Sequence, residues 1–431
     1  MKKTFNSYSF GCRVNHAERE QIDIQMTKKG FKHVKEDPDF FIINTCSVTH
    51  NAERSARQLI YQTRRNNPKT KIVVTGCSAT YWLKNGLYKD IPADLFIDNV
   101  NKEFLVALLE KKFNKMPQKI KRQDDKYISP IVDKFQSSDR IVIKIQDGCH
   151  RFCTFCIVPY LRGLPKSKKI NEIIKIIKSD KEPLKEVILT AINTEAFGKD
   201  TGESFTDLIK EILSQTAVPR ISFGSIHPWS ITDEFLEFYL RPEIQKRLVH
   251  FFHIPLQSGS NKMLQLMRRV HTREDMLNRV NNIASVNPYA FIATDVIVGF
   301  LDETDDDFQD TYNFLAESPI SKFHVFRFSK RIQTAAYFMA KRLSEPTDLK
   351  KKERALLLRE LSDKKYQNFL TSLIGYTSET LILKEKKGKF TKALLNNQIP
   401  VLIKGRILNR NLPMCKAIEL EEGELIAEVV G

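Results

Sequence analysis

The sequence has no long hydrophobic run. In a chain of 431 residues, the longest apolar stretches, such as "DVIVGF" at 295–300, are only a few residues long. A membrane helix needs roughly 20 apolar residues. The first residues, "MKKTFNSYSFGC", contain two lysines but no apolar segment after them, unlike a secretion signal. We therefore expect a cytoplasmic protein without a membrane partner.

Cysteine is scarce, with seven residues in the whole chain. Cytosolic reductants keep thiols free, so a cytoplasmic protein does not depend on disulfides. Hydrophobic residues make up 42% of the sequence, which is enough for a core without covalent cross-links. The few cysteines therefore indicate metal or redox chemistry.

Negative charge is in short supply. Lysine and arginine number 69 against 52 aspartates and glutamates, a formal charge of +17. Such a surplus favours a polyanionic partner such as RNA. A lysine-rich proteome background would produce the same surplus, so charge alone leaves both interpretations open.

The chain is too long for one hydrophobic core, and its patterns divide it into several parts. Residues 1–114 alternate short strands with helices, the first from about Ala17, which predicts an open parallel α/β domain. Residues 115–138 are polar and aperiodic and are predicted to be a linker. Residues 139–370 contain six strand–helix units, which predict a partial (βα)6 barrel with its active site at the carboxyl ends of the strands. Residues 371–431 alternate apolar and polar side chains between turns, which predicts a small β-barrel.

Three cysteines, Cys149, Cys153 and Cys156, follow the first predicted barrel strand with the spacing C-x3-C-x2-C. Structural zinc sites usually have four ligands in paired C-x2-C motifs, and the iron–sulfur clusters of electron carriers are bound by four cysteines. Three thiolates would leave one iron of a cluster open to a substrate or cofactor. The loop therefore predicts a catalytic iron–sulfur cluster.

Another three cysteines, Cys12, Cys46 and Cys77, each come directly after a predicted strand of the first domain. Parallel strands bring their carboxyl ends to one edge of a sheet, where such sheets bind ligands. We therefore expect the three thiols to converge. The alternative is that they are small buried hydrophobic residues. Cys415 has no such partner and is expected to be structural.

The C-x3-C-x2-C loop after the first strand of a six-unit barrel resembles the radical S-adenosylmethionine family. The resemblance implies that Cys149, Cys153 and Cys156 hold a [4Fe-4S] cluster. The open iron of that cluster would bind S-adenosylmethionine, and one electron would cleave this cofactor to a deoxyadenosyl radical. Phe155 matches the aromatic position that lies near the adenine in this family. Further cofactor-binding candidates at barrel strand ends are Asn193, Gln257 and Asp295.

Several motifs spread over nearly the whole chain resemble the methylthiotransferase branch of that family: "GCRVN", "NTC", "DGCHRFCTFCIVPYLRG", "IPLQSGS" and "TDVIVGF". The first and third are most similar to enzymes that modify threonylcarbamoyladenosine next to the tRNA anticodon. Arg13 and Val14 stand where the isopentenyladenosine branch has Gln-Met and the ribosomal-protein branch has Pro-Lys. Isopentenyladenosine and a ribosomal-protein aspartate remain the alternative acceptors.

The resemblance also implies cofactors and partners. Cys12, Cys46 and Cys77 would hold an auxiliary [4Fe-4S] cluster that delivers sulfur, and a methylthio group would be added to adenine C2. The partners would be the anticodon stem-loop of tRNA and a one-electron donor such as flavodoxin or ferredoxin. Residues 371–431 stand where the family has a small RNA-binding (TRAM-like) barrel.

Basic residues on predicted loops are the candidate RNA contacts: Lys166, Lys168, Lys389 and Arg406. The first two replace arginines of the family pattern, which preserves charge but loses bidentate geometry. A protein of a different class, a non-catalytic iron–sulfur protein that binds RNA or transfers electrons, would share the cysteines. Such proteins normally close their clusters with four ligands.

Overall fold

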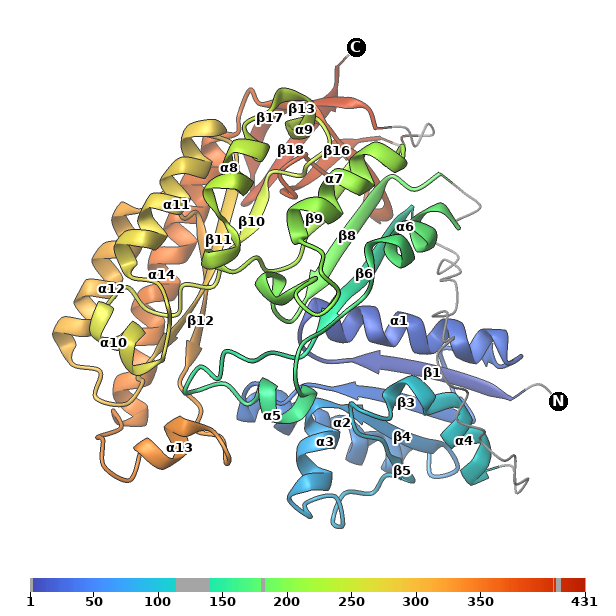
Figure 1. Ribbon diagram of the computed structural model, residues 1–431. Helices are drawn as coiled ribbons and strands as arrows, with labels where there is room; N and C mark the ends of the chain where they lie inside the picture. The colour runs from blue at the N-terminus through green and yellow to red at the C-terminus, as the bar shows by residue number, and fades with distance from the viewer. Residues whose placement is uncertain (1–2, 114–138, 180–182, 406, 408–411, 431) are drawn as a thin grey trace.

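The computed structural model describes residues 3–113, 139–179, 183–405, 407 and 412–430 (Figure 1). The predicted linker at 115–138 and the candidate Arg406 lie outside the described residues. Figure 1 shows the N-terminal sheet below, the barrel strands β6–β12 above it and the last strands at the top. The limits between these parts remain predictions.

The N-terminal part is a parallel sheet with the strand order β2-β1-β3-β4-β5. Its strands are β1 Thr4–Ser9, β2 Lys32–His33, β3 Phe40–Thr45, β4 Lys71–Gly76 and β5 Leu95–Phe96. Its helices are α1 Arg13–Lys28, α2 His50–Asn66, α3 Cys77–Lys84, η1 Lys102–Phe104 and α4 Leu105–Phe113. Buried side chains of α1 and α4 pack on one face, and those of α2 and α3 on the other. The central strands are therefore almost entirely apolar, as expected for a sheet covered on both faces.

The central part contains the six predicted parallel strands. They are β6 Arg140–Asp147, β8 Glu186–Ala191, β9 Arg220–Phe223, β10 Phe251–His253, β11 Phe291–Val298 and β12 Lys322–Arg327. They pair in the orders β6-β8-β9 and β10-β11-β12, and the bridge between Ser225 and His253 joins the two groups. The short strand β7, Lys166–Ser167, adds an antiparallel edge next to β6. The open-barrel prediction is confirmed.

Helices cover the outside of this barrel, and one large apolar core lies between them and the strands. The helices of the central part are α5 Val158–Arg162, α6 Ile170–Lys178, η2 Thr194–Ala196, α7 Phe205–Gln215, η3 Pro228–Ser230, α8 Asp233–Tyr239, α9 Pro242–Gln245, α10 Asn261–Leu266, α11 Arg273–Val286, α12 Asp305–Glu317, α13 Ala335–Met339 and α14 Asp348–Ser372. Helix α5 does not lie on the outer face but packs on the N-terminal part. Helix α12 begins with a capping box between Thr304 and Asp307. This box satisfies backbone N–H groups of the first turn. The acidic side chains of that turn interact favourably with the positive end of the helix dipole.

The C-terminal part is a six-stranded sheet with the order β13-β17-β18-β16-β15-β14. The strands are β13 Thr377–Glu379, β14 Leu381–Lys387, β15 Phe390–Leu394, β16 Pro400–Lys404, β17 Met414–Glu421 and β18 Glu424–Val429. All pairs are antiparallel except β16 with β18. Cys415 is fully buried in the apolar core of this sheet, as a structural residue would be.

The carboxyl edge of the N-terminal sheet lies against α5, the helix that follows the loop of Cys149, Cys153 and Cys156. Lys84 donates from Nζ to the carbonyl oxygen of Tyr160 at 2.6 Å, and Asn99 donates from Nδ2 to that of Leu161 at 3.1 Å. None of the helices in the described part of the chain has the length and apolarity needed to cross a membrane. The contacts with α5 bring both sets of cysteines to the same region of the molecule.

Candidate metal centres

The loop between β6 and α5 holds Cys149, Cys153 and Cys156, and all three are free thiols. Backbone hydrogen bonds shape this loop: the Cys149 nitrogen donates to Gly163 at 3.0 Å, and the Cys156 nitrogen donates to Cys153 at 2.9 Å. Burial and the charges of Cys153 and Cys149 together raise the pKa of Cys156 to about 12. The three cysteines therefore lie near one another on this loop.

The other three cysteines also converge, from three different strand ends. Cys12 lies between β1 and α1, Cys46 follows β3, and Cys77 begins α3 directly after β4. Burial raises the pKa of Cys46 to about 12, and the charges of Cys77 and Cys12 contribute in the same direction. Cys12 keeps contact with solvent, although the surrounding protein atoms raise the pKa of its thiol.

Two glycines show how closely the strand ends approach each other. Gly11 has φ +89°, and a Cβ atom there would lie 2.7 Å from the Cys46 sulfur. Gly76 has φ +95°, and a Cβ atom there would lie 2.4 Å from the Thr45 carbonyl oxygen. Any side chain would be both strained and in collision at these positions. The chain can therefore bring Cys12 beside Cys46, and Cys77 beside Cys46, only because glycine precedes Cys12 and Cys77.

The raised pKa values of Cys12, Cys46, Cys149 and Cys156 mean that these four thiols are protonated when no cation is near. Thiolates are the form that binds metals, and a bound metal displaces the proton. Three cysteines gathered in one place therefore suit a positive group such as an iron–sulfur cluster. Both sets of cysteines offer three sulfurs in this way.

Polar side chains donate hydrogen bonds to the sulfurs of the loop cysteines. Asn193 Nδ2 lies 3.8 Å from Cys149 Sγ, and Arg269 Nη1 lies 3.7 Å from Cys153 Sγ. Hydrogen bonds to sulfur help to set the reduction potential of iron–sulfur clusters. Asn193, a cofactor-binding candidate from the sequence, lies beside the loop cysteines. Arg269 was missed, because no motif marks it.

The strand-end cysteines have an equivalent donor. Asn99 Nδ2 lies 3.7 Å from Cys77 Sγ and also donates to the Leu161 carbonyl. Asn99 lies just beyond β5, and sequence analysis did not single it out. Each set of cysteines therefore has an asparagine amide directed at one sulfur.

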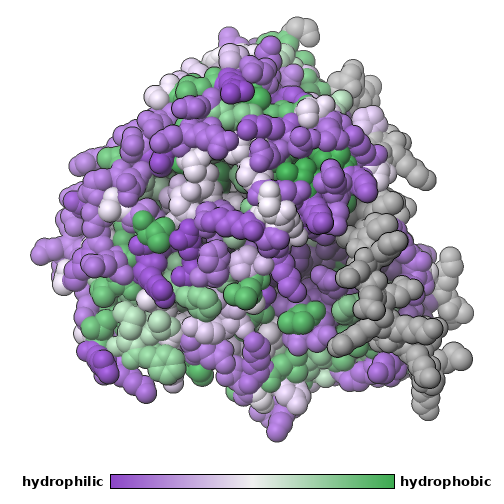
Figure 2. Space-filling view, viewed as in Figure 1, coloured by the Kyte–Doolittle hydropathy of each residue, from purple (hydrophilic) through white to green (hydrophobic). Residues whose placement is uncertain are grey.

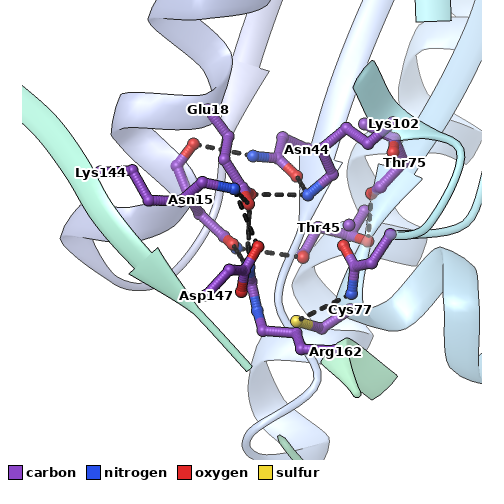
Figure 3. A network of polar contacts seen from close by, with 12 residues as sticks. Asn15, Glu18, Asn44, Thr45, Thr75, Cys77, Lys102, Lys144, Asp147 and Arg162 are labelled. Carbon is purple, nitrogen blue, oxygen red and sulfur yellow. Dashed lines mark hydrogen bonds and ion pairs between the residues drawn. The ribbon is translucent and has the colours of Figure 1, made fainter. Parts of the chain in front are cut away.

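A buried network of charges lies between α1, η1 and the barrel (Figure 3). Glu18 accepts from Arg162 at 2.8 Å, from Lys102 at 2.6 Å and from Lys144 at 3.0 Å. Arg162 also donates to Asp147 at 2.8 Å, and its side chain is only 1% exposed. Burial raises the pKa of Glu18, but the three cations outweigh burial and hold it well below its ordinary value. Three cations thus face two carboxylates.

Charges of this network act on the strand-end cysteines. Burial raises the pKa of Cys12 and Cys46, and the charge of Arg162 opposes this rise, whereas Glu18 raises the pKa of Cys12. In Figure 3, Arg162 lies beside Cys77 at the edge of the network. The ion pair between Arg162 and Glu18 could not be predicted from the sequence, because the two residues are 144 positions apart.

A pocket joins the loop cysteines to the region of Cys46. Its lining includes Val48, Thr49, Phe155, Cys156, Gln257 and Asp295. Val48 and Thr49 follow Cys46 closely in the chain, and Cys156 belongs to the other set. Three of the four candidate cofactor residues therefore line this pocket, and the fourth, Asn193, contacts Cys149.

The candidate RNA contacts fall into two places. Lys166 and Lys168 line a second cavity of about 600 Å³, which Lys144 and Arg162 also border. Lys389 lies exposed in the turn between β14 and β15, in the C-terminal sheet. The structure therefore does not gather all described candidates into one patch. The space-filling view shows a largely hydrophilic face with scattered apolar groups (Figure 2).

Comparisons with known proteins agree with this architecture. Residues 143–315 match the radical SAM superfamily, and residues 4–98 match the uncharacterized protein family UPF0004. The structure of the radical S-adenosylmethionine methyltransferase TsrM from Kitasatospora setae has a TM-score of 0.52 and 11% identity, covering 78% of this chain and 74% of that one. The fold and the cysteine loop thus define a radical S-adenosylmethionine domain.

Relatives that match over most of the chain define the family more narrowly. The threonylcarbamoyladenosine tRNA methylthiotransferase MtaB of Aquifex aeolicus is 35% identical, over 90% of this chain and 94% of that protein. The tRNA-2-methylthio-N(6)-dimethylallyladenosine synthase of Natranaerobius thermophilus is 32% identical, over 80% of this chain and 78% of that protein. The chain belongs to the radical S-adenosylmethionine methylthiotransferase family, and this prediction from the sequence is confirmed.

Proposed function

We propose that this protein is a tRNA methylthiotransferase that acts on threonylcarbamoyladenosine next to the anticodon. It would add sulfur and a methyl group to C2 of the adenine by a radical S-adenosylmethionine mechanism. The observation that carries the proposal is the pocket that Cys156 lines on one side and that Val48 and Thr49, close after Cys46, line on the other. An acceptor in this pocket would lie between the two sets of cysteines.

Cys149, Cys153 and Cys156 would hold a [4Fe-4S] cluster whose open iron binds S-adenosylmethionine. When bound, this cluster supplies the electron that cleaves the cofactor. The side chains of this protein would orient and enclose S-adenosylmethionine and the substrate adenosine. Phe155 and Ile297 offer apolar surface in the pocket, and Gln257 and Asp295 offer hydrogen-bonding groups. Radical chemistry suits the reaction, because an unactivated aromatic C–H has no acidic proton for a side-chain base.

Cys12, Cys46 and Cys77 would hold the auxiliary [4Fe-4S] cluster, which supplies the sulfur. Arg162 would stabilise the thiolates by its charge, since that charge opposes the rise that burial causes in the pKa of Cys12 and Cys46. Asn99 would donate its amide hydrogen to Cys77. Glu18 and Asp147 would hold the Arg162 guanidinium in place.

The anticodon stem-loop of tRNA is the proposed macromolecular partner in the cytoplasm. The formal charge of +17 suits a polyanion. Lys166, Lys168 and Lys389 are the described residues proposed to contact RNA, and Arg406 is proposed from the sequence alone. A flavodoxin or ferredoxin would be the one-electron donor.

Nucleoside mass spectrometry tests the acceptor. We would compare tRNA from a strain that lacks this gene with tRNA from the same strain carrying it again. The methylthio derivative of threonylcarbamoyladenosine should disappear and return, while the isopentenyladenosine derivative should stay unchanged. A change in the isopentenyladenosine derivative instead would refute the proposed acceptor but retain the reaction.

A further inference from the structure

A hydrogen-bonded trio of side chains lies on the inner face of strands β10, β11 and β12. Asp295 and His324 face each other across paired strands, and His253 ends β10 next to them. One oxygen of Asp295, Oδ1, lies 3.1 Å from His253 Nε2 and 3.3 Å from His324 Nδ1. The other ring nitrogen of His253, Nδ1, lies 2.7 Å from Ser225 Oγ.

These contacts fix the role of each ring. Burial raises the pKa of Asp295, but the hydrogen bonds from both histidines outweigh burial and hold it well below its ordinary value. Asp295 is therefore an ionised acceptor, and each histidine directs an N–H at it. Both nitrogens of His253 are then satisfied. Nε2 of His324 has no hydrogen-bond partner in the described part of the chain, and the His324 side chain is 55% exposed.

The trio lies next to the pocket that Cys156 lines. Asp295 lines that pocket together with Cys156. Phe326, which also lines the pocket, stands two residues after His324 on β12, so both side chains lie on the same face of the strand. Cys156 therefore lines one part of the pocket and Asp295 another. His324 lies beside Asp295, and its Nε2 is available to bond a ligand.

The acceptors of the related enzymes differ in the substituent on N6 of the adenine. A threonylcarbamoyl group carries N–H groups, a hydroxyl, a carbonyl oxygen and a carboxylate, whereas a dimethylallyl group is a hydrocarbon. A site built to hydrogen-bond a polar group discriminates strongly against an analogue without it, because its own polar atoms are then left unpaired. The trio presents such polar atoms.

We infer that His324, held in place by Asp295 and His253, is a specificity-determining residue that hydrogen-bonds the polar N6 substituent of the substrate adenosine. This inference rests on the proposed function, and it names the residue by which the enzyme would select its acceptor. His324 Nε2 accepts a hydrogen bond from an N–H or hydroxyl group of the threonylcarbamoyl chain. Asp295 and His253 are positioning residues, because they act through His324.

The test uses the enzyme with both clusters and two anticodon stem-loop RNAs, one with threonylcarbamoyladenosine and one with isopentenyladenosine. The variant His324→Leu removes the hydrogen-bonding ring and keeps similar volume. We expect kcat/KM for the threonylcarbamoyl RNA to fall between about fivefold and a hundredfold, the range for loss of one hydrogen bond that leaves its partner unpaired. The rate on the isopentenyl RNA should not fall, and S-adenosylmethionine cleavage without RNA should stay unchanged.

Two further variants control the experiment. His324→Gln keeps a hydrogen-bonding end and should retain most of the preference for the polar substrate. His33→Leu alters an exposed histidine on the outer strand β2 and should change neither rate. An iron content equal to that of the unaltered enzyme verifies that each variant is folded.

Three results would overturn the inference. His324→Leu could leave the preference between the two RNAs unchanged, or lower both rates equally. The third is a bound metal: the ligand atoms of His253, Asp295 and His324 lie within 4.8 Å of one another, as in a metal site. One equivalent of zinc or another metal beyond the cluster iron, lost in His324→Leu, would assign the trio to that metal.

If the unaltered enzyme modifies the isopentenyl RNA alone, the proposed acceptor fails together with the inference. If it modifies the threonylcarbamoyl RNA, only the inference is at stake.

Discussion

The two sets of cysteines are built in opposite ways. Cys149, Cys153 and Cys156 stand on one loop, whereas Cys12, Cys46 and Cys77 come from three strand ends. The loop set is close together in the sequence before the chain folds. The strand-end set exists only when β1, β3 and β4 are paired and α1 is docked. We therefore expect the strand-end set to be more sensitive to packing, and the two sets to be separable in function.

The largest effects should come from removing a single sulfur. Cys153→Ala should abolish cleavage of S-adenosylmethionine and, with it, methylthiolation of RNA, because the open-iron cluster would be lost. Cys46→Ala should retain cleavage but yield no methylthiolated product. Chromatography of deoxyadenosine and mass spectrometry of the RNA measure the two activities in the same reaction. Cys415→Ala, at a buried cysteine outside both sets, serves as the control. Methylthiolated product from Cys46→Ala would contradict the assignment of the strand-end set.

A smaller change tests the packing of the strand-end set. In Gly11→Ala, the new methyl group would collide with Cys46 and occupy an unfavourable φ of +89°. We expect methylthiolation to fall at least about tenfold through lost cluster iron, since overpacking and strain each cost on the order of 1–3 kcal/mol. Cleavage of S-adenosylmethionine should persist.

Gly30→Ala is a matched control for this variant. Gly30 has a similar φ of +85°, but no atom lies within 4 Å of the position of its Cβ. It therefore carries the backbone strain without the collision. Equal loss of iron in both variants would show that strain, and not contact with Cys46, governs the site.

The charge network between α1, η1 and the barrel should contribute to stability. Glu18→Gln leaves Arg162, Lys102 and Lys144 with one carboxylate fewer, and breaking a buried ion pair costs about 3–5 kcal/mol. Urea unfolding under reducing conditions measures this loss. Glu274→Gln is the control, because Glu274 pairs with Arg273 at the surface, where a pair contributes less than about 1 kcal/mol. Equal effects would contradict the role of the network.

The same network predicts a dependence on pH. The pKa of Glu18 is lowered in the folded state, so its stabilisation is complete above its unfolded-state value of about 4.3. It is lost as the pH falls through the folded-state pKa. The unfolding free energies of the unaltered protein and Glu18→Gln should therefore differ at pH 7 and converge in acid. A constant difference down to pH 3 would rule out this linkage.

The smallest effects should come from the two asparagines that donate to sulfur. Asn99→Ala should lower the reduction potential of the auxiliary cluster alone, and Asn193→Ala that of the radical cluster alone. One lost hydrogen bond of about 0.5–1.5 kcal/mol corresponds to roughly 20–60 mV for a one-electron couple. Redox titration followed by electron paramagnetic resonance separates the two signals. A shift of both signals in either variant would mean that the two sites are coupled.

The sequence was sufficient to predict the elements that depend on local pattern. The six barrel strands and the convergence of Cys12, Cys46 and Cys77 follow from apolar runs and from the rule that parallel strands end at one edge. Helix α1 begins at Arg13, earlier than the position near Ala17 that periodicity indicates. The reason is tertiary: Asn15 and Glu18 are buried because they bind partners from other parts of the chain.

Contacts between side chains that are far apart in the sequence could not be predicted. Arg269 reaches Cys153 from 116 residues away, and His324 reaches Asp295 from a neighbouring strand. No spacing rule links such residues, because the fold alone brings them together. The pairing of Glu18 with Arg162 belongs to the same class.

The most direct test of two separate clusters is the iron content of the variant in which Cys12, Cys46 and Cys77 are all alanine. The unaltered protein should hold about eight irons per chain, and the variant about four, with S-adenosylmethionine cleavage retained. If the unaltered protein holds only about four irons, or the variant loses both its iron and cleavage, the two sets do not form independent centres.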